Sequence, residues 1–271
     1  QGWNLGRWPD GPFELNRNSP QAQGLVGWWP TLGSRGANVL RDYGGRAFHG
    51  TLHGNVVPVG SGDFGSALRF NNSAGDYVSG GIALDVTGNV TVSLWAMNAS
   101  INPTEGRTIF GMVPFNLYSQ ESAWCGGHIA LSTQWKYWIY DDTGHAPVPA
   151  GQWALYTFVV NSVNNLLYLD GKQIWSSART RNPANDPTAY EIGRRLDLGT
   201  CPYDGDIADA RIYNRALSPA VIWQMAHDKK WDLYLPLRRW WALRAPVAGW
   251  AFNPVWSGRG VVGSSVVRGM Q

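Results

Sequence analysis

Charged residues and sulfur are scarce in this sequence. Asp, Glu, Lys and Arg make up 15% of the 271 residues, whereas a soluble domain usually has about a quarter. Two cysteines and four methionines are present. No apolar run approaches the roughly 20 residues of a membrane-spanning helix, so no transmembrane segment is expected. With so little charge and 44% hydrophobic residues, the composition argues against disorder and predicts a globular fold that buries much of its surface.

The residue patterns of common catalytic sites are also missing. No Gly-x-Ser-x-Gly elbow, phosphate-binding glycine loop or metalloprotease histidine pair occurs. Glycoside hydrolysis requires two carboxylates that flank the scissile bond. Strict strand alternation places Asp209 on the face opposite to Asp204 and Asp206, and the adjacent Asp141 and Asp142 point apart. We therefore expect no enzymatic activity.

The two cysteines, Cys125 and Cys201, are far apart in sequence and lack metal-ligand spacing. Such a pair in an extracellular fold usually forms a disulfide, which is our prediction. Two buried thiols are the alternative.

Glycine and tryptophan, by contrast, are abundant, with 33 and 16 residues. Short runs of β-branched and aromatic residues bounded by Gly, Pro, Asn or Asp predict strands over residues 90–97, 129–132, 135–140, 153–160, 166–169 and 207–213. The pair Asp170-Gly171 favours a tight hairpin turn. Ser218 followed by Pro219 predicts the start of a single short helix. Many short strands with one late helix are typical of an all-β, two-sheet antiparallel sandwich of the jelly-roll type.

The net charge of +3 is unevenly distributed along the chain. Residues 229–271 contain seven Lys and Arg against one Asp and carry +6, so residues 1–228 carry −3. Residues 1–23 and 231–271 are rich in Trp, Gly and Pro without a clear period. We predict extended arms there, flanking one domain over residues 24–230. A basic, Trp-rich arm can bind nucleic acid, but docking on an acidic body is the interpretation we prefer.

Several motifs follow one another in a fixed order between residues 24 and 226. They are GLVGWW at 24–29, DYGGRAFHGTL at 42–52, FGSALRF at 64–70, VTVSLW at 90–95, LYLDGK at 167–172 and DGDIADARIYNRALS at 204–218. This order resembles the laminin-G-like jelly-roll domains of the concanavalin A-like lectin/glucanase superfamily. The resemblance implies a β-sandwich in which Gly50, Gly65 and Gly205 lie where the chain turns or where strands cross closely.

The resemblance also implies a structural calcium ion, a metal that prefers six to eight oxygen ligands. In the family such an ion lies between the Asp-x-Gly-Gly loop and the final strand, which nominates Asp42 and Asp209. The paired acids usual in the final strand are reduced here to Ala208-Asp209. The alternative is therefore that Asp209 pairs with Arg211 or another base.

Sugar binding in this fold uses rim loops or a concave face, where aromatic rings stack on sugar rings and polar groups fix the hydroxyls. The candidate ligand-binding residues are Tyr118, Trp124, Trp135, Asp141 and Asp142. Plain core packing is the alternative role for the three aromatic residues.

Two functions follow from this sequence. The first is a non-enzymatic structural protein of the extracellular space, a cell surface or a virion surface, which assembles into a homo-oligomer or filament through its arms. The reason for predicting assembly is that long apolar-rich segments without a core of their own are stable only when they pack against another surface. The second is a lectin-like adhesion module that binds carbohydrate.

Overall fold

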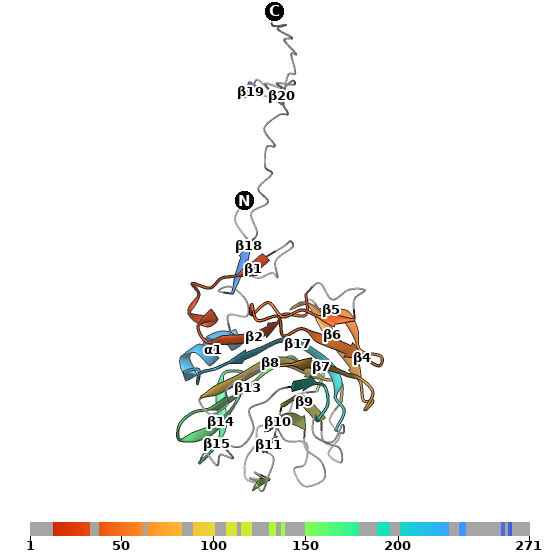
Figure 1. Ribbon diagram of the computed structural model, residues 1–271, viewed down its shortest axis with the longest axis vertical. Helices are drawn as coiled ribbons and strands as arrows, with labels where there is room; N and C mark the ends of the chain where they lie inside the picture. Colours follow the sequence, from red (N-terminus) through yellow and green to blue (C-terminus); the bar gives the residue numbers. More distant parts are fainter. Residues whose placement is uncertain are drawn as a thin grey trace, which may run out of the picture.

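The computed structural model describes fourteen stretches of the chain. They are residues 13–32, 38–61, 64–82, 89–100, 107–112, 115–120, 130–133, 137–138, 150–178, 189–195, 201–227, 233–236, 256–257 and 260–261. Most of these residues belong to two large antiparallel sheets, which lie face to face (Figure 1). The predicted two-sheet sandwich is therefore confirmed.

The first sheet, here called sheet I, has the strand order β15-β14-β13-β8-β17-β6-β5, and β2 lies beside the second half of β17. Its strands are β2 (Leu25–Trp29), β5 (Val57–Ser61), β6 (Gly65–Asn71), β8 (Val90–Asn98), β13 (Ala154–Val160), β14 (Asn164–Leu169), β15 (Lys172–Ala178) and β17 (Asp204–Tyr213).

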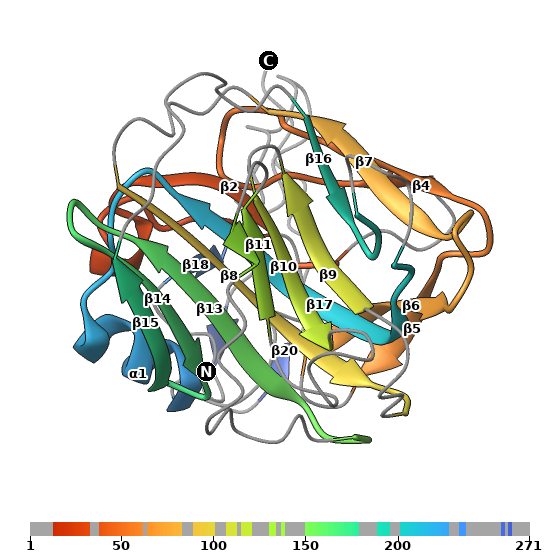
Figure 2. The same ribbon diagram turned by 90° about the horizontal axis from the view of Figure 1, so that it is seen from below.

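The second sheet, sheet II, has the order β12-β11-β10-β9-β16-β7-β4-β3. Figure 2 views the molecule from the side of this sheet. Its strands are β3 (Val39–Leu40), β4 (Gly50–His53), β7 (Tyr77–Gly81), β9 (Arg107–Met112), β10 (Phe115–Gln120), β11 (Ala130–Thr133), β12 (Tyr137–Trp138) and β16 (Ala189–Ile192).

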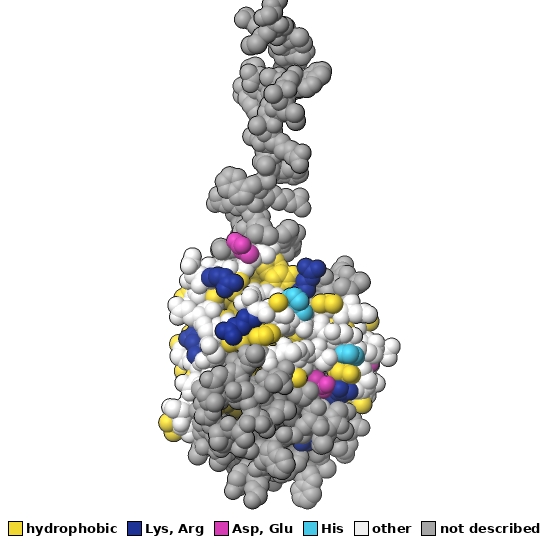
Figure 3. Space-filling model, in the orientation of Figure 1, with side chains coloured by type: hydrophobic (Ala, Val, Ile, Leu, Met, Phe, Trp, Pro, Cys, Tyr) yellow, Lys and Arg dark blue, Asp and Glu magenta, His cyan; other side chains and the backbone are white. Residues whose placement is uncertain are grey.

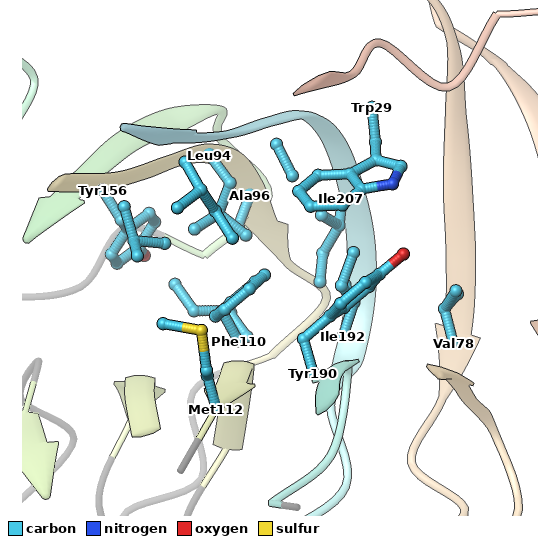
Figure 4. Packing of buried hydrophobic residues seen from close by; sticks show 14 of the residues in the cluster. Trp29, Val78, Leu94, Ala96, Phe110, Met112, Tyr156, Tyr190, Ile192 and Ile207 are labelled. Carbon is cyan, nitrogen blue, oxygen red and sulfur yellow. The ribbon is translucent and has the colours of Figure 1, made fainter. Parts of the chain in front are cut away.

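The main core fills the space between the sheets. Residues two apart along a strand point into it, as Val92, Leu94 and Ala96 of β8 do. Figure 4 shows Trp29, Leu94 and Tyr156 of sheet I meeting Phe110 and Tyr190 of sheet II. All five side chains are buried.

Tyr190 has its place in this core because two glycines leave room for it. Tyr190 is paired with Gly80, which is paired in turn with Gly50. A Cβ atom on Gly80 would lie 2.5 Å from the Tyr190 ring, and one on Gly50 would lie 2.9 Å from its hydroxyl oxygen. The hydroxyl donates to the Phe48 carbonyl at 3.0 Å. Gly50 thus lies where side chains of neighbouring strands approach closely, within one sheet.

The predicted hairpin and helix are also confirmed. Asp170 and Gly171 have φ angles of 50° and 81° and join β14 to β15, as an Asp-Gly turn requires. Helix α1 (Pro219–His227) starts after Ser218, whose Oγ accepts from the Val221 amide at 3.4 Å. The helix covers part of the outer face of sheet I, where Ile222 is fully buried.

Strand β17 contains a bulge that the alternation rule did not predict. Asp209 has a φ of 49°, and the pairing with β8 shifts register between Ala208 and Arg211. Ala208 points to the outer face of sheet I and Ala210 into the main core. Because the bulge adds one residue, Asp209 lies on the outer face, where it contacts Trp28. The expectation that Asp209 faces away from Asp206 is wrong for this reason.

Parts of both predicted arms are folded onto the body. In the N-terminal region, β1 (Phe13–Leu15) is followed by the 3-10 turn η1 (Pro20–Ala22), and β1 pairs antiparallel with β18 (Tyr234–Pro236). We call this pair the terminal ribbon. Phe13 packs on Tyr43 at a ring-centroid distance of 4.7 Å. A separate short pair joins β19 (Trp256–Ser257) to β20 (Gly260–Val261).

A buried ion pair lies between the terminal ribbon and sheet I. Asp209 and Arg211 pair through their side chains, which are 0% and 3% exposed. Burial lowers the pKa of Arg211, but the charge of Asp209, the hydrogen bond to it and the nearby Tyr213 and Tyr234 together outweigh burial and raise the pKa. Gln21 accepts a further hydrogen bond from Arg211 at 3.3 Å, and the Trp28 indole donates to Asp209 at 2.8 Å. The pair thus ties β17 to β2 and to η1.

Buried tyrosines make the fold sensitive to alkaline pH. Burial raises the pKa of Tyr156, Tyr190, Tyr203 and Tyr213, all 0% exposed, above the usual value. Below about pH 10 these groups are protonated in both states, so they cause no pH dependence. Above it the unfolded chain releases protons that the fold retains, and each tyrosine lowers the free energy of unfolding by up to about 1.4 kcal/mol per pH unit.

We therefore expect cooperative unfolding between about pH 11 and 12, since domains are stable by only about 5–15 kcal/mol. Tyrosinate absorbance and far-ultraviolet circular dichroism, followed in one titration, should change together. A full rise in absorbance near pH 10 with intact dichroism would contradict the prediction.

Candidate functional site

The outer face of sheet II carries a row of polar residues in register. Since Val78 and Tyr190 point into the main core, their strand neighbours point the other way. Thr51 pairs with Ser79, and Ser79 pairs with Glu191. We call these three residues the polar row. Backbone pairing extends the row to Val39 on one side and to Gly111, Asn116, Ser132 and Trp138 on the other.

Next to the polar row, three side chains form a stack. The His53 ring lies parallel to the Tyr77 ring, with centroids 4.2 Å apart and an interplanar angle of 9°. The Arg194 guanidinium carbon lies 3.3 Å from the Tyr77 ring centroid. Both neighbours cannot share one ring face at these distances, so Tyr77 lies between them. The His53–Tyr77–Arg194 stack joins β4 and β7 to the turn after β16.

Hydrogen bonds hold the stack against the polar row. Arg194 donates to both carboxylate oxygens of Glu191, at 2.9 and 2.6 Å, and to the Ala74 carbonyl at 3.0 Å. The pKa of Arg194 is raised, first by its hydrogen bond to Glu191. His53 Nε2 and Ser79 Oγ are 2.8 Å apart. The face thus presents charged and hydroxyl groups with fixed orientations, as recognition of a polyhydroxylated ligand requires.

The ligand-binding residues predicted from the sequence belong to a different part of the chain from the stack. Tyr118 lies in β10 of sheet II, paired with Thr108 and Ala130. The other four candidates lie outside the described residues: Trp124, Trp135, Asp141 and Asp142. Sequence reasoning missed the stack. The available signal was the period of two in the segments GTLH and YVSGG, which puts His53 and Tyr77 on one face.

The acidic residues at the start of β17 have structural partners. Asp206 forms a two-point ion pair with Arg69, with both N–O distances at 2.8 Å. Asp204 accepts from Ser100 Oγ at 3.3 Å. Cys201 lies just before β17, and Cys125 lies outside the described residues, so the disulfide stays a prediction.

Asp42, nominated for calcium, instead organises the loop after β3. Its Oδ1 accepts from the backbone amides of Trp28 at 2.9 Å and Gly44 at 2.6 Å, and its Oδ2 accepts from Phe48 at 3.0 Å. Asp209 is similarly occupied, by the Trp28 indole and by Arg211. Asp42 therefore faces backbone N–H donors, and Asp209 faces an indole N–H and the positive charge of Arg211. This arrangement does not fit a calcium ion held between them, because calcium requires those oxygen lone pairs. In the part of the chain that is described, no group of three or more His, Cys, Asp and Glu side chains has a geometry suited to a metal.

From this hydrogen bonding we expect calcium to leave stability unchanged. A ligand that binds the folded state raises its free energy of unfolding by mass action. The melting temperature should therefore be the same with excess EDTA and with millimolar calcium. Magnesium at the same concentration is the control for ionic strength. A rise with calcium alone would show that a calcium site exists.

The face-to-face sheets, the one α-helix among the described residues and the polar outer face define a lectin-like sandwich. A family model described as the concanavalin A-like lectin/glucanases superfamily, of the laminin G type, matches residues 71–222. This is more than half of the chain, which therefore belongs to that family. No curated protein sequence matches it. No helix among the described residues has the length and apolar character needed to cross a membrane.

Several solved structures share the fold. Domain 4 of AbnA, an extracellular GH43 arabinanase of Geobacillus stearothermophilus in complex with arabinotriose, is 21% identical with a TM-score of 0.58. The alignment covers 74% of this chain and 98% of that domain. A structure of botulinum neurotoxin type C, whose cell entry depends on two ganglioside molecules, is 16% identical with a TM-score of 0.57, covering 80% and 52%.

A sialidase of Trypanosoma rangeli in complex with sialic acid is also similar, at 16% identity and a TM-score of 0.55. The alignment covers 76% of this chain and 33% of the sialidase. This chain thus spans about half of the neurotoxin chain and a third of the sialidase. At these identities the likeness establishes the fold alone.

Proposed function

We propose that this chain is a non-enzymatic carbohydrate-binding module whose saccharide site is the outer face of sheet II. The observation that carries the proposal is the His53–Tyr77–Arg194 stack beside the polar row. It holds a guanidinium, a carboxylate and hydroxyl groups in fixed positions on a sheet face where Thr51 is exposed and the Arg194 and Glu191 side chains are 17% and 7% exposed. Such groups hydrogen-bond sugar hydroxyls at little entropic cost, because they are already ordered.

The structural neighbours support this proposal. One of them is a domain in complex with arabinotriose, and another belongs to a toxin that interacts with gangliosides. A module of this kind acts outside the cell, on a cell surface or on a virion surface, where glycans are displayed. The pairing of Asp204 and Asp206 with structural partners agrees with binding without hydrolysis.

The test compares two matched substitutions on opposite sheets. Thr51 is exposed in the polar row, and Val57 is 47% exposed on β5 of sheet I. Thr51→Arg should place a long side chain over the stack and weaken glycan binding at least about tenfold, which is about 1.4 kcal/mol. Val57→Arg should bind like the wild type. Binding would be measured on a glycan array and then by calorimetry. Equal binding by both variants would disprove the assigned site, and turnover of any array glycan would disprove a purely binding role.

A second candidate function, assembly through the arms, has one observation in its favour. Phe13 begins β1 and is paired with Pro236, which ends β18. The chain before residue 13 and the chain after residue 236 therefore leave the body at the same end of the terminal ribbon. If copies associate through these arms, deletion of residues 237–271 should lower the molar mass measured by light scattering. A monomer both before and after deletion would exclude this function.

A further inference from the structure

Trp223 on helix α1 is unusual among the described large apolar side chains. It is 56% exposed, and the other exposed large hydrophobic residues in the described stretches are valines: Val39, Val57 and Val163. Figure 3 shows that charged side chains on the face it views are few and scattered. The large amphipathic ring of tryptophan is suited to stacking on a ligand, which makes this position a candidate contact.

The indole of Trp223 is held in one orientation. His227, one helical turn later, stacks on it with ring centroids 4.1 Å apart and an interplanar angle of 18°. His227 Nδ1 also lies 2.8 Å from the Trp223 carbonyl oxygen. One face of the indole is therefore covered by a fixed ring, while more than half of the side-chain surface is accessible.

The helix turn that carries Trp223 lies against a polar hairpin turn. Helix α1 packs against the β14–β15 turn so closely that a Cβ atom on Gly171 would lie 2.8 Å from the Trp223 Cα. The neighbours of Gly171 in the turn, Asp170 and Lys172, are both exposed, as is Gln173. Asp170 is itself fixed by a hydrogen bond from the Leu155 amide at 2.8 Å. Figure 2 shows α1 alongside β14 and β15.

The small exposed apolar area at Trp223 indicates which kind of ligand could bind there. A stable protein interface buries about 800 Å² on each partner, and Trp223 is a single aromatic residue among polar neighbours. Val163 lies at the far end of β14, and Val57 and Val39 lie on strands at other edges of the sheets. A single exposed indole next to a turn with an exposed carboxylate, ammonium and amide matches one sugar ring, whose apolar face stacks while its hydroxyls hydrogen-bond.

We infer that Trp223 is the floor of a second saccharide site, which takes a neutral sugar ring and is bordered by Asp170, Lys172 and Gln173. The inference rests on the proposed carbohydrate-binding function. Helix α1 covers the outer face of sheet I, whereas the polar row lies on the outer face of sheet II. The module then holds two glycan chains on opposite sides, which raises its avidity for a densely glycosylated surface.

The test uses the full chain labelled with 5-fluorotryptophan and observed by fluorine nuclear magnetic resonance. The signal lost in Trp223→Phe identifies this residue among the 16 tryptophans. Arabinotriose, cellotriose and N-acetyllactosamine are then titrated to millimolar concentration. We expect the Trp223 signal to shift with at least one of them, and Trp223→Ala to weaken that binding at least about tenfold. Val163→Ala, which removes exposed apolar surface elsewhere, should have no effect.

The outcomes separate this inference from the function on which it rests. Saccharide binding that Thr51→Arg abolishes and that leaves the Trp223 signal unmoved would overturn the second site and keep the first. Binding of none of the three sugars, by signal shift or by calorimetry, would overturn both. A Trp223 signal that moves with protein concentration alone would identify a second copy of the chain as the occupant, and would overturn the sugar assignment.

Discussion

Asp209→Asn is expected to lower the free energy of unfolding by about 3–5 kcal/mol. The substitution keeps a side chain that tolerates the positive φ of the bulge and can still accept from the Trp28 indole. What it removes is the negative charge beside Arg211, whose side chain is 3% exposed. A buried cation without its partner is costly, because the protein interior solvates it poorly.

Urea unfolding measures this effect, and two further variants isolate its cause. Asp206→Asn removes the carboxylate of an ion pair whose arginine side chain is 50% exposed and stays in contact with water, so it should cost less than about 1 kcal/mol. The double variant Asp209→Asn with Arg211→Met leaves no buried charge and should recover part of the loss. Equal losses for Asp209→Asn and Asp206→Asn would mean that solvent reaches Arg211, contrary to the structure.

Gly205→Ala is expected to lower the free energy of unfolding by about 2–6 kcal/mol. Gly205 has a φ of 145°, a region open almost only to glycine. An added Cβ would collide with the Met97 carbonyl oxygen and would lie 3.1 Å from the Ala99 amide nitrogen. Both are backbone atoms of the end of β8 and its continuation, so they cannot turn aside as a side chain would.

Gly60→Ala is the matched control for this prediction. Gly60 lies in β5 of the same sheet, and a Cβ there would have no neighbour within 4 Å. Its substitution should leave stability unchanged or raise it by up to about 1 kcal/mol, since alanine reduces the freedom of the unfolded chain. Urea midpoints of the two variants give the comparison. Similar midpoints would show that β8 and β17 do not approach as closely as described.

The sequence was informative wherever a local rule determines the structure. The Asp170-Gly171 turn, the start of α1 at Pro219 and the strand ending at Tyr213 all follow from short patterns. The bulge at Asp209 does not, because its cause is the change of partner along β17, from β6 to β2. The alternation of polar and apolar residues along the strand does not reveal that change of partner, so the face of Asp209 was predicted wrongly.

The candidate site was much harder to foresee than the fold. His53, Tyr77 and Arg194 come from three strands or turns, and Arg194 is more than a hundred residues from Tyr77 in sequence. Only the order β16-β7-β4 within sheet II brings them together. The predicted ligand residues were chosen for their chemistry along one stretch of chain, and that approach cannot find a site built by strand order.

The geometry of the terminal ribbon determines how the molecule responds to mechanical force. Because β1 and β18 are antiparallel and their outer ends, Phe13 and Pro236, are paired, tension that pulls the two ends of the chain apart acts across the ribbon. Its hydrogen bonds are then loaded one after another, as in unzipping. The ribbon should open at low force and take up extension first, while the sandwich that carries both proposed glycan sites stays intact.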